Sequence, residues 1–119
     1  MQARKQTFLD EIIGQADQAL RTVFGEPAGT GRNDPARSAT EGELTATGRA
    51  TSLNLMRVNH AGEVCAQALY QGQALTAREE DTRRQMEQAA EEENDHLLWC
   101  RHRIHELGGH TSLLNPVWY

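Results

Sequence analysis

Several residue types and patterns are scarce or missing in this sequence of 119 residues, and each absence excludes a class of protein. Aromatic residues make up 5% of the chain, too few for a β-sandwich, which needs Val, Ile and aromatic side chains. No run approaches the roughly 18 apolar residues of a membrane span, and the N-terminal stretch MQARKQTFLDEIIG lacks the apolar core of a signal peptide. We therefore expect one all-α domain that stays in the cytoplasm unless it binds a membrane peripherally.

Cysteine and clustered basic residues are scarce as well. Cys65 and Cys100 lie in helical patterns and form no CxxC pair, which favours a reduced, cytosolic protein over a disulfide scaffold. The net charge is -5 and the basic residues are dispersed, whereas binding to nucleic acid requires clustered Lys and Arg. We expect no nucleic-acid partner.

The apolar residues that are present recur at helical spacing in three segments. Residues 7–24 predict an amphipathic packing helix, and two longer helices follow over about residues 44–76 and 80–107, the last ending at Gly108 and Gly109. The chain thus divides into an N-terminal amphipathic helix (1–25), a flexible linker rich in Gly, Pro, Ser and Thr (26–43) and a long helix pair with the start of the next segment (44–119). The apolar stripe of the first helix is Phe8, Ile12, Ala16, Leu20 and Val23.

Two acidic residues interrupt the apolar stripes of the long helices. Glu63 and Glu93 each lie about 15 residues from the turn near residues 78–80, so both stand roughly 22 Å from it and face each other in an antiparallel pair. An unpaired ionised carboxylate in an apolar stripe is costly and signals a partner or a metal. His96 projects from the same face as Glu93 and can ligate the same ion.

The spacing alone leaves two interpretations of these residues open. In one, Glu63, Glu93 and His96 bind a metal ion. In the other, Glu63 pairs with Arg57 or with an arginine of the third helix, and His96 caps a backbone carbonyl.

Neighbouring histidines and a cysteine are weaker candidates. His60, one turn before Glu63, fits an interface histidine better than a group that supports a metal ligand. A zinc site made of His96, Cys100 and His102 is disfavoured, because the three residues do not share one face and a fourth ligand is missing.

The acidic residues around His96 belong mainly to the outer side of the helix. Glu91 and Glu92 point away from the stripe into solvent. Asn94 and Asp95 are placed on the outer side by the same helical phase. For Asp95 a second interpretation also stays open, in which its carboxylate orients the His96 ring.

Three stretches, LMRVNHAGEVCAQALYQGQALTAR, AAEEENDHLLWC and ELGGHTSLLNPVWY, closely resemble the demethoxyubiquinone hydroxylase family of ubiquinone biosynthesis. The resemblance implies a ferritin-like di-iron helical bundle and a monooxygenase that uses oxygen to hydroxylate the ring of a prenylated demethoxyubiquinone. It also implies peripheral association with the cytoplasmic face of the bacterial inner membrane. By resemblance, Glu63 is the first iron ligand, Glu93 the bridging carboxylate and His96 the histidine on the same iron as Glu63.

The resemblance further implies that only half of the ligands for two iron ions lie in this chain. Di-iron bundles take a Glu from each of two helices and a Glu-x-x-His from each of the other two. We expect an N-terminal half that is inactive as a monomer and leaves apolar surface bare. Three hypotheses remain: half of such a hydroxylase, working with other ubiquinone-biosynthesis proteins; a homodimer that rebuilds the site; or a non-catalytic helical fragment.

Overall fold

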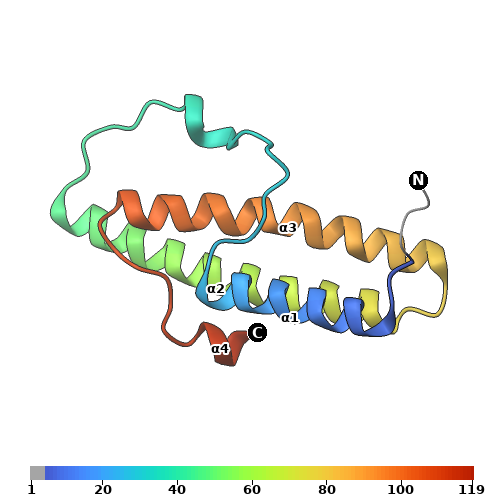
Figure 1. The fold of residues 1–119 in the computed structure, drawn as a ribbon. Coiled ribbons are helices and arrows are strands. Elements are labelled where there is room, and N and C mark those ends of the chain that lie inside the picture. The colour runs from blue at the N-terminus through green and yellow to red at the C-terminus, as the bar shows by residue number, and fades with distance from the viewer. Residues whose placement is uncertain (1–4) are drawn as a thin grey trace.

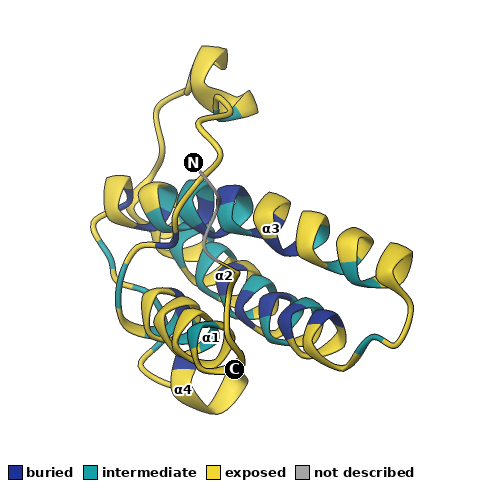
Figure 2. Cartoon of the chain, turned by 45° about the vertical axis from the view of Figure 1, so that its right-hand side comes forward, coloured by how far each residue is buried: buried dark blue, intermediate teal, exposed yellow. Residues whose placement is uncertain are grey.

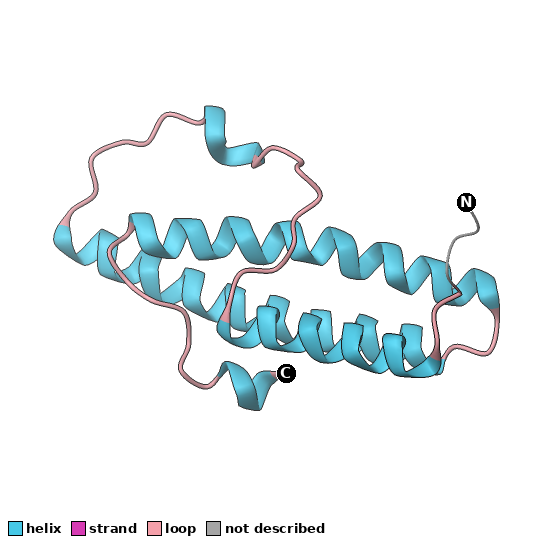
Figure 3. Ribbon diagram, viewed as in Figure 1, coloured by secondary structure: helices cyan, strands magenta, loops and turns pink. Residues whose placement is uncertain are grey.

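The computed structural model of the protein describes residues 5–119, which form helices and loops and no strand (Figure 3). The helices are α1 (Phe8–Phe24), α2 (Ala46–Thr76), α3 (Glu80–Glu106) and the short α4 (Asn115–Trp118), and a 3-10 turn, η1 (Pro35–Ser38), lies between α1 and α2. The all-α prediction is confirmed, and the three predicted helices agree with α1, α2 and α3. Residues 1–4 of the predicted segment 1–25 lie outside the described residues, and the division into three segments stays a prediction.

Local sequence sets where the helices begin and end. Thr7 and Asp10 form a capping box at the start of α1: the Asp10 amide donates to Thr7 Oγ1 at 3.3 Å, and the Thr7 amide donates to the Asp10 carboxylate at 2.8 Å. The Thr45 hydroxyl accepts from the Gly48 amide at 3.0 Å and begins α2. Gly108 has a φ of 83°, a conformation that favours glycine, and it follows the end of α3 as predicted.

The antiparallel pair of α2 and α3 forms the centre of the molecule (Figure 1). The turn at residues 77–79 joins the two helices, and their facing sides carry most of the buried residues (Figure 2). Polar groups are buried there too: Gln67 Nε2 donates to Asn94 Oδ1 at 2.8 Å. The apolar core is therefore small, and its members are Val64, Ala74, Ala90, Leu97, Cys100, Ile104 and Leu107.

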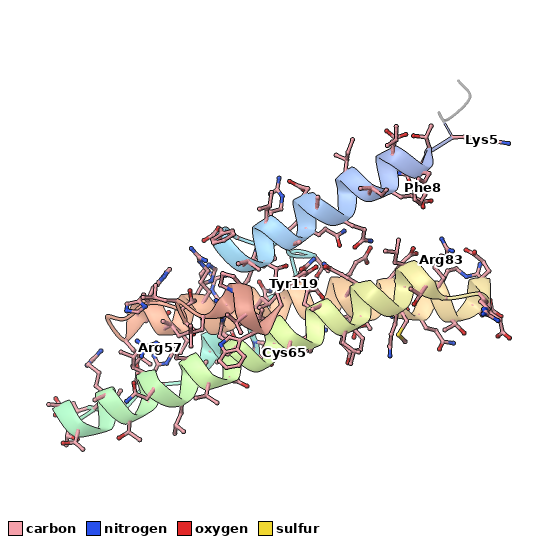
Figure 4. All side chains as sticks on the ribbon, turned by 90° about the horizontal axis from the view of Figure 1, so that it is seen from below. Lys5, Phe8, Arg57, Cys65, Arg83 and Tyr119 are labelled. Carbon is pink, nitrogen blue, oxygen red and sulfur yellow. The ribbon has the colours of Figure 1, made fainter. Side chains whose placement is uncertain are left out.

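The helix α1 and the C-terminal segment pack against α2. The buried Gln71 of α2 joins them, because its amide donates to Gln18 Oε1 of α1 at 2.9 Å and its carbonyl oxygen accepts from the Tyr119 hydroxyl. Figure 4 shows Tyr119 lying close to α2, and Arg57 Nε donates to the His110 carbonyl at 2.9 Å. The chain after α3 thus returns along α2.

The apolar stripe predicted to pack α1 against the protein is largely exposed, so that part of the prediction is wrong. Phe8 and Leu20 are 71% and 60% exposed, while Thr22 is buried. The side of α1 that carries Gln18 and Thr22 meets α2, since Gln18 pairs with the buried Gln71 there. An apolar helix face is left on the surface of the described chain (Figure 2).

Truncation of Leu97 tests the small core. Leu97 is fully buried, so Leu97→Ala is expected to lower the free energy of unfolding by about 2–5 kcal/mol through lost burial and a cavity. Leu113→Ala is the matched control, because Leu113 is 85% exposed and its truncation is expected to change stability by less than about 0.5 kcal/mol. Urea unfolding followed by circular dichroism measures both, and equal losses would contradict the assigned core.

Candidate metal centre

Glu63 of α2 and the pair Glu93 and His96 of α3 converge where the two long helices face each other. His96 Nδ1 lies 3.5 Å from Glu93 Oε1 and 4.0 Å from Glu63 Oε2. One ligand atom from each residue lies within 4.8 Å of the other two. We call these three residues the carboxylate-histidine trio. The register predicted from the distance to the turn is therefore confirmed.

The alternative interpretation of Glu63 as a partner of arginine does not hold. Arg57 turns to the carbonyl of His110, and on α3 the Arg101 side chain binds the Gly25 carbonyl while Arg103 binds Glu41. Nor does His96 cap a carbonyl: its ring nitrogens contact only the two carboxylates among the residues described. Within residues 5–119, no Arg or Lys side chain forms an ion pair with Glu63 or Glu93.

Glu93 is the electrostatic centre of the trio. It is 6% exposed, and its Oε1 is buried without a hydrogen-bond partner. Burial, with hydrogen bonding to Glu63 and the negative charges of Glu63 and Glu92, raises the pKa of Glu93 to about 8. A bound cation would reverse this effect by favouring the ionised carboxylate, so the site is suited to a metal ion.

The trio is open on one side. The side chain of Glu93 is 8% exposed, whereas those of Glu63 and His96 are 23% and 41% exposed. The two carboxylates and one imidazole thus form the floor of a site and leave positions for further ligands. Carboxylate and imidazole donors with open positions are typical of non-haem iron.

The comparisons with known proteins agree with this donor set. Residues 50–119 match the family model described as ubiquinone biosynthesis protein COQ7, which covers more than half of the chain. The chain belongs to the COQ7 family. The proteins of this family are di-iron enzymes with a ferritin-like helical fold, so the fold class expected from the sequence is confirmed.

Several bacterial proteins named 3-demethoxyubiquinol 3-hydroxylase are similar to the chain. All 119 residues of the chain align with the protein from Nitrosococcus oceani at 58% identity, and the aligned region covers 56% of that relative's length. The chain is 55% identical to those from Chromobacterium violaceum and Legionella pneumophila, over 93% and 98% of the chain and 53% and 55% of the relatives. The chain thus spans about half the length of the curated relatives that it matches, and no solved structure matches it.

The other residues considered from the sequence do not join the trio. His60 is buried, as an interface residue would be, and burial together with the charge of Arg101 lowers its pKa to about 4. Cys100 Sγ accepts from Asn59 Nδ2 at 3.3 Å and His102 is exposed, so the residues of the disfavoured zinc site do not gather. In the described part of the chain, the trio is the one cluster of at least three such groups that can hold a metal.

Asp95 departs most from the prediction. The helical phase placed it on the outer side with Glu92 and Asn94, yet Asp95 is 2% exposed and Asn94 is half-buried. The reason is tertiary: the Thr30 amide and hydroxyl donate to the Asp95 carboxylate at 2.8 Å and 2.6 Å and cover it. The periodicity of α3 carries no signal of a partner 65 residues away. Glu91 and Glu92 are exposed as predicted.

The raised pKa of Glu93 predicts how stability depends on pH in the metal-free protein. Folding favours the protonated carboxyl, so this contribution is complete below about pH 4.5 and is lost as the pH rises toward about 8. Between about pH 6.5 and 8, the buried His60 stays neutral and does not contribute to the change of stability with pH. Glu93→Gln is therefore expected to remove this decline, which in the parent amounts to about 2 kcal/mol of unfolding free energy between about pH 6.5 and 8.

Urea unfolding at several pH values measures this change. Glu91→Gln is the matched control, since it alters an exposed carboxylate two residues away and should keep the decline of the parent. A Glu93→Gln variant that declines as steeply as the parent would contradict the buried, protonated carboxyl.

Proposed function

We propose that this chain supplies half of the ligands of a di-iron site in an oxygen-dependent hydroxylase that acts on a demethoxyubiquinol. The observation that carries the proposal is the convergence of Glu63, Glu93 and His96 in a member of a di-iron enzyme family. The name of the relatives, 3-demethoxyubiquinol 3-hydroxylase, supports the reaction.

The chemistry of the donors supports iron. Glu63 and Glu93 bring two negative charges and His96 a neutral nitrogen, a set that tolerates both ferrous and ferric iron. Bound iron would supply the activation of oxygen for hydroxylation of the quinol ring. The chain's own residues hold the ion, and Glu93 must release its proton to do so.

The trio accounts for one half of a complete di-iron set. Two ferrous ions carry four positive charges, and Glu63 and Glu93 neutralise two of them. A full set requires another Glu and another Glu-x-x-His. Residues of a longer polypeptide, as in the relatives, are the first source of these ligands, and a second copy of this chain related by a two-fold axis is the other.

A cavity beside α3 is the candidate site for part of the substrate. It has a volume of about 1040 Å³ and is lined by Met56, Trp99 and Cys100 together with residues of the stretch between α1 and α2. The trio residues do not line the cavity, but Trp99, which does, lies one turn along α3 from His96, with 5.5 Å between the ring centroids. Its lining is mixed, because charged side chains such as Arg32, Asp34 and Arg103 stand beside the apolar ones.

The exposed apolar face of α1 supports peripheral association with a membrane. No helix in residues 5–119 has the length and apolar composition to cross a bilayer. The exposed apolar face of α1 includes Phe8, Ile13 and Phe24, which are 71%, 65% and 71% exposed. Such a face can lie in the interface of a bilayer, and we assign it to the cytoplasmic face of the bacterial inner membrane.

An anaerobic titration with ferrous iron tests the metal site. The parent chain is expected to bind iron, and Glu93→Ala and His96→Ala are expected to weaken binding at least tenfold because each removes a ligand. Glu91→Gln is the control and should bind as the parent does, since Glu91 is exposed on the outer side of α3. Equilibrium dialysis measures the number of iron ions bound per chain, and analytical sedimentation measures whether the protein is a monomer or a dimer.

The outcomes of this titration separate the three hypotheses. One weakly held ion per monomer supports half of a larger site, and two ions per dimer support a site rebuilt from two copies. A chain that binds no iron, or a Glu93→Ala variant that binds as tightly as the parent, would contradict the proposal and favour a non-catalytic fragment.

Flotation with vesicles that contain anionic lipid tests the membrane contact. Ile13→Glu places a charge on the apolar face of α1 and is expected to reduce the bound fraction at least fivefold, because burying a charge in the interface is unfavourable. Val58→Glu is the matched control, since Val58 is 71% exposed on α2. Equal binding by both variants and the parent would exclude α1 as the contact.

A further inference from the structure

A short stretch between α1 and α2 crosses α3 at the level of the trio. We call residues 29–34 the strap. It is fixed by the Asp95 carboxylate, which accepts from the Thr30 amide at 2.8 Å and the Thr30 hydroxyl at 2.6 Å and lies 3.6 Å from Arg32 Nε. Asp95 is 2% exposed while Thr30 and Arg32 are exposed, so the buried carboxylate anchors a surface segment through part-buried bonds.

Two glycines allow the strap to lie this close to α3. A Cβ at position 29 would lie 2.6 Å from Leu98 Cδ1 and 3.2 Å from Asp95 Oδ1, so a side chain there would displace the Leu98 side chain or the strap. Gly31 has a φ of 87°, which side chains other than glycine adopt at a cost. The backbone is thus shaped to bring Thr30 and Arg32 onto α3.

The strap also touches the aromatic neighbour of His96. The Arg32 guanidinium lies 4.9 Å from the centroid of the Trp99 ring, within the range of a cation–π contact. The Trp99 ring in turn lies 5.5 Å from the imidazole of His96, with an angle of 47° between the planes. A continuous set of contacts therefore runs from Asp95 through the strap and Trp99 to His96.

His96 needs such support. A histidine that binds a metal usually has its ring held by a hydrogen bond from its other nitrogen to a carboxylate or carbonyl. Among the described residues, no such bond to His96 is present, and the nearby Asp95 carboxylate is engaged by Thr30 and Arg32. Since its side chain is 41% exposed, the imidazole would sample other rotamers unless packing restrains it.

We propose that the strap positions His96: by pressing Trp99 against the imidazole, it keeps Nδ1 directed at Glu63 and Glu93. Asp95, Thr30 and Arg32 are positioning residues in this arrangement and do not touch the metal. The inference rests on the proposed role of His96 as a ligand. It gives the stretch between α1 and α2 a function at the metal site.

Thr30 offers the sharpest test, because it lies far from the trio in the sequence and outside the core. Thr30→Val removes the hydroxyl at nearly constant volume, and Thr30→Ser keeps it. We expect Thr30→Val to lose the nuclear Overhauser effects between the His96 and Trp99 rings in the metal-free protein. It should also weaken Co²⁺ binding by about tenfold, the lower end of the effect of removing a group that orients a ligand. Thr30→Ser should retain both.

A second pair of variants tests the cation–π contact. Both variants remove one positive charge, so a difference between them does not arise from net charge. Arg32→Gln is expected to act like Thr30→Val, whereas Arg37→Gln, on the same connecting stretch, should match the parent. Adding Thr30→Val to a Trp99→Leu background should produce no further loss of Co²⁺ affinity, because the contact through which it acts is already gone. Helix content by circular dichroism checks that every variant folds.

The proposal is overturned if Thr30→Val keeps the ring contacts, or if its loss of Co²⁺ affinity is the same with and without Trp99. A parent chain that binds no Co²⁺ would instead contradict the metal assignment. In that case the Overhauser effects in the metal-free protein still decide whether the strap holds His96, so the two failures are distinguishable.

Discussion

The arrangement of this protein depends on the register in which α3 packs against α2. Val64 and Leu97 are fully buried between the helices, and the bond from Gln67 to Asn94 lies one turn of α2 beyond Glu63. A shift of one turn would expose the apolar side chains and break the amide bond. Packing therefore holds Glu63 beside Glu93 although the two side chains would repel each other if both were ionised, and this proximity favours a cation between them.

The interior around this site is unusually polar for a small helical protein. His60, Gln67 and Gln71 are buried on α2, and Gln71 links α1 and the C-terminal residue through its side-chain amide. Hydrogen bonds of this kind require specific partners, so they define how α1 and the C-terminal segment attach. The same attachment leaves the apolar face of α1 directed outward and exposed.

The stretch between α1 and α2 has more structure than its composition indicates. Its Gly-rich and polar sequence provides close approach and a left-handed turn, and the buried carboxylate of Asp95 supplies the anchor. Anchoring at Asp95 places Arg32 on Trp99, next to His96. One acidic residue thus connects a surface segment, through Trp99, to His96 of the carboxylate-histidine trio.

The sequence by itself determined the helices, their antiparallel register and the grouping of Glu63, Glu93 and His96, because helical period, rise and turn position are local properties of the chain. Only the tertiary structure decided that Asp95 is buried and that the apolar face of α1 is exposed. Both depend on contacts between segments far apart in the chain, Thr30 with Asp95 and Gln18 with Gln71, and no periodic pattern within one helix encodes such partners.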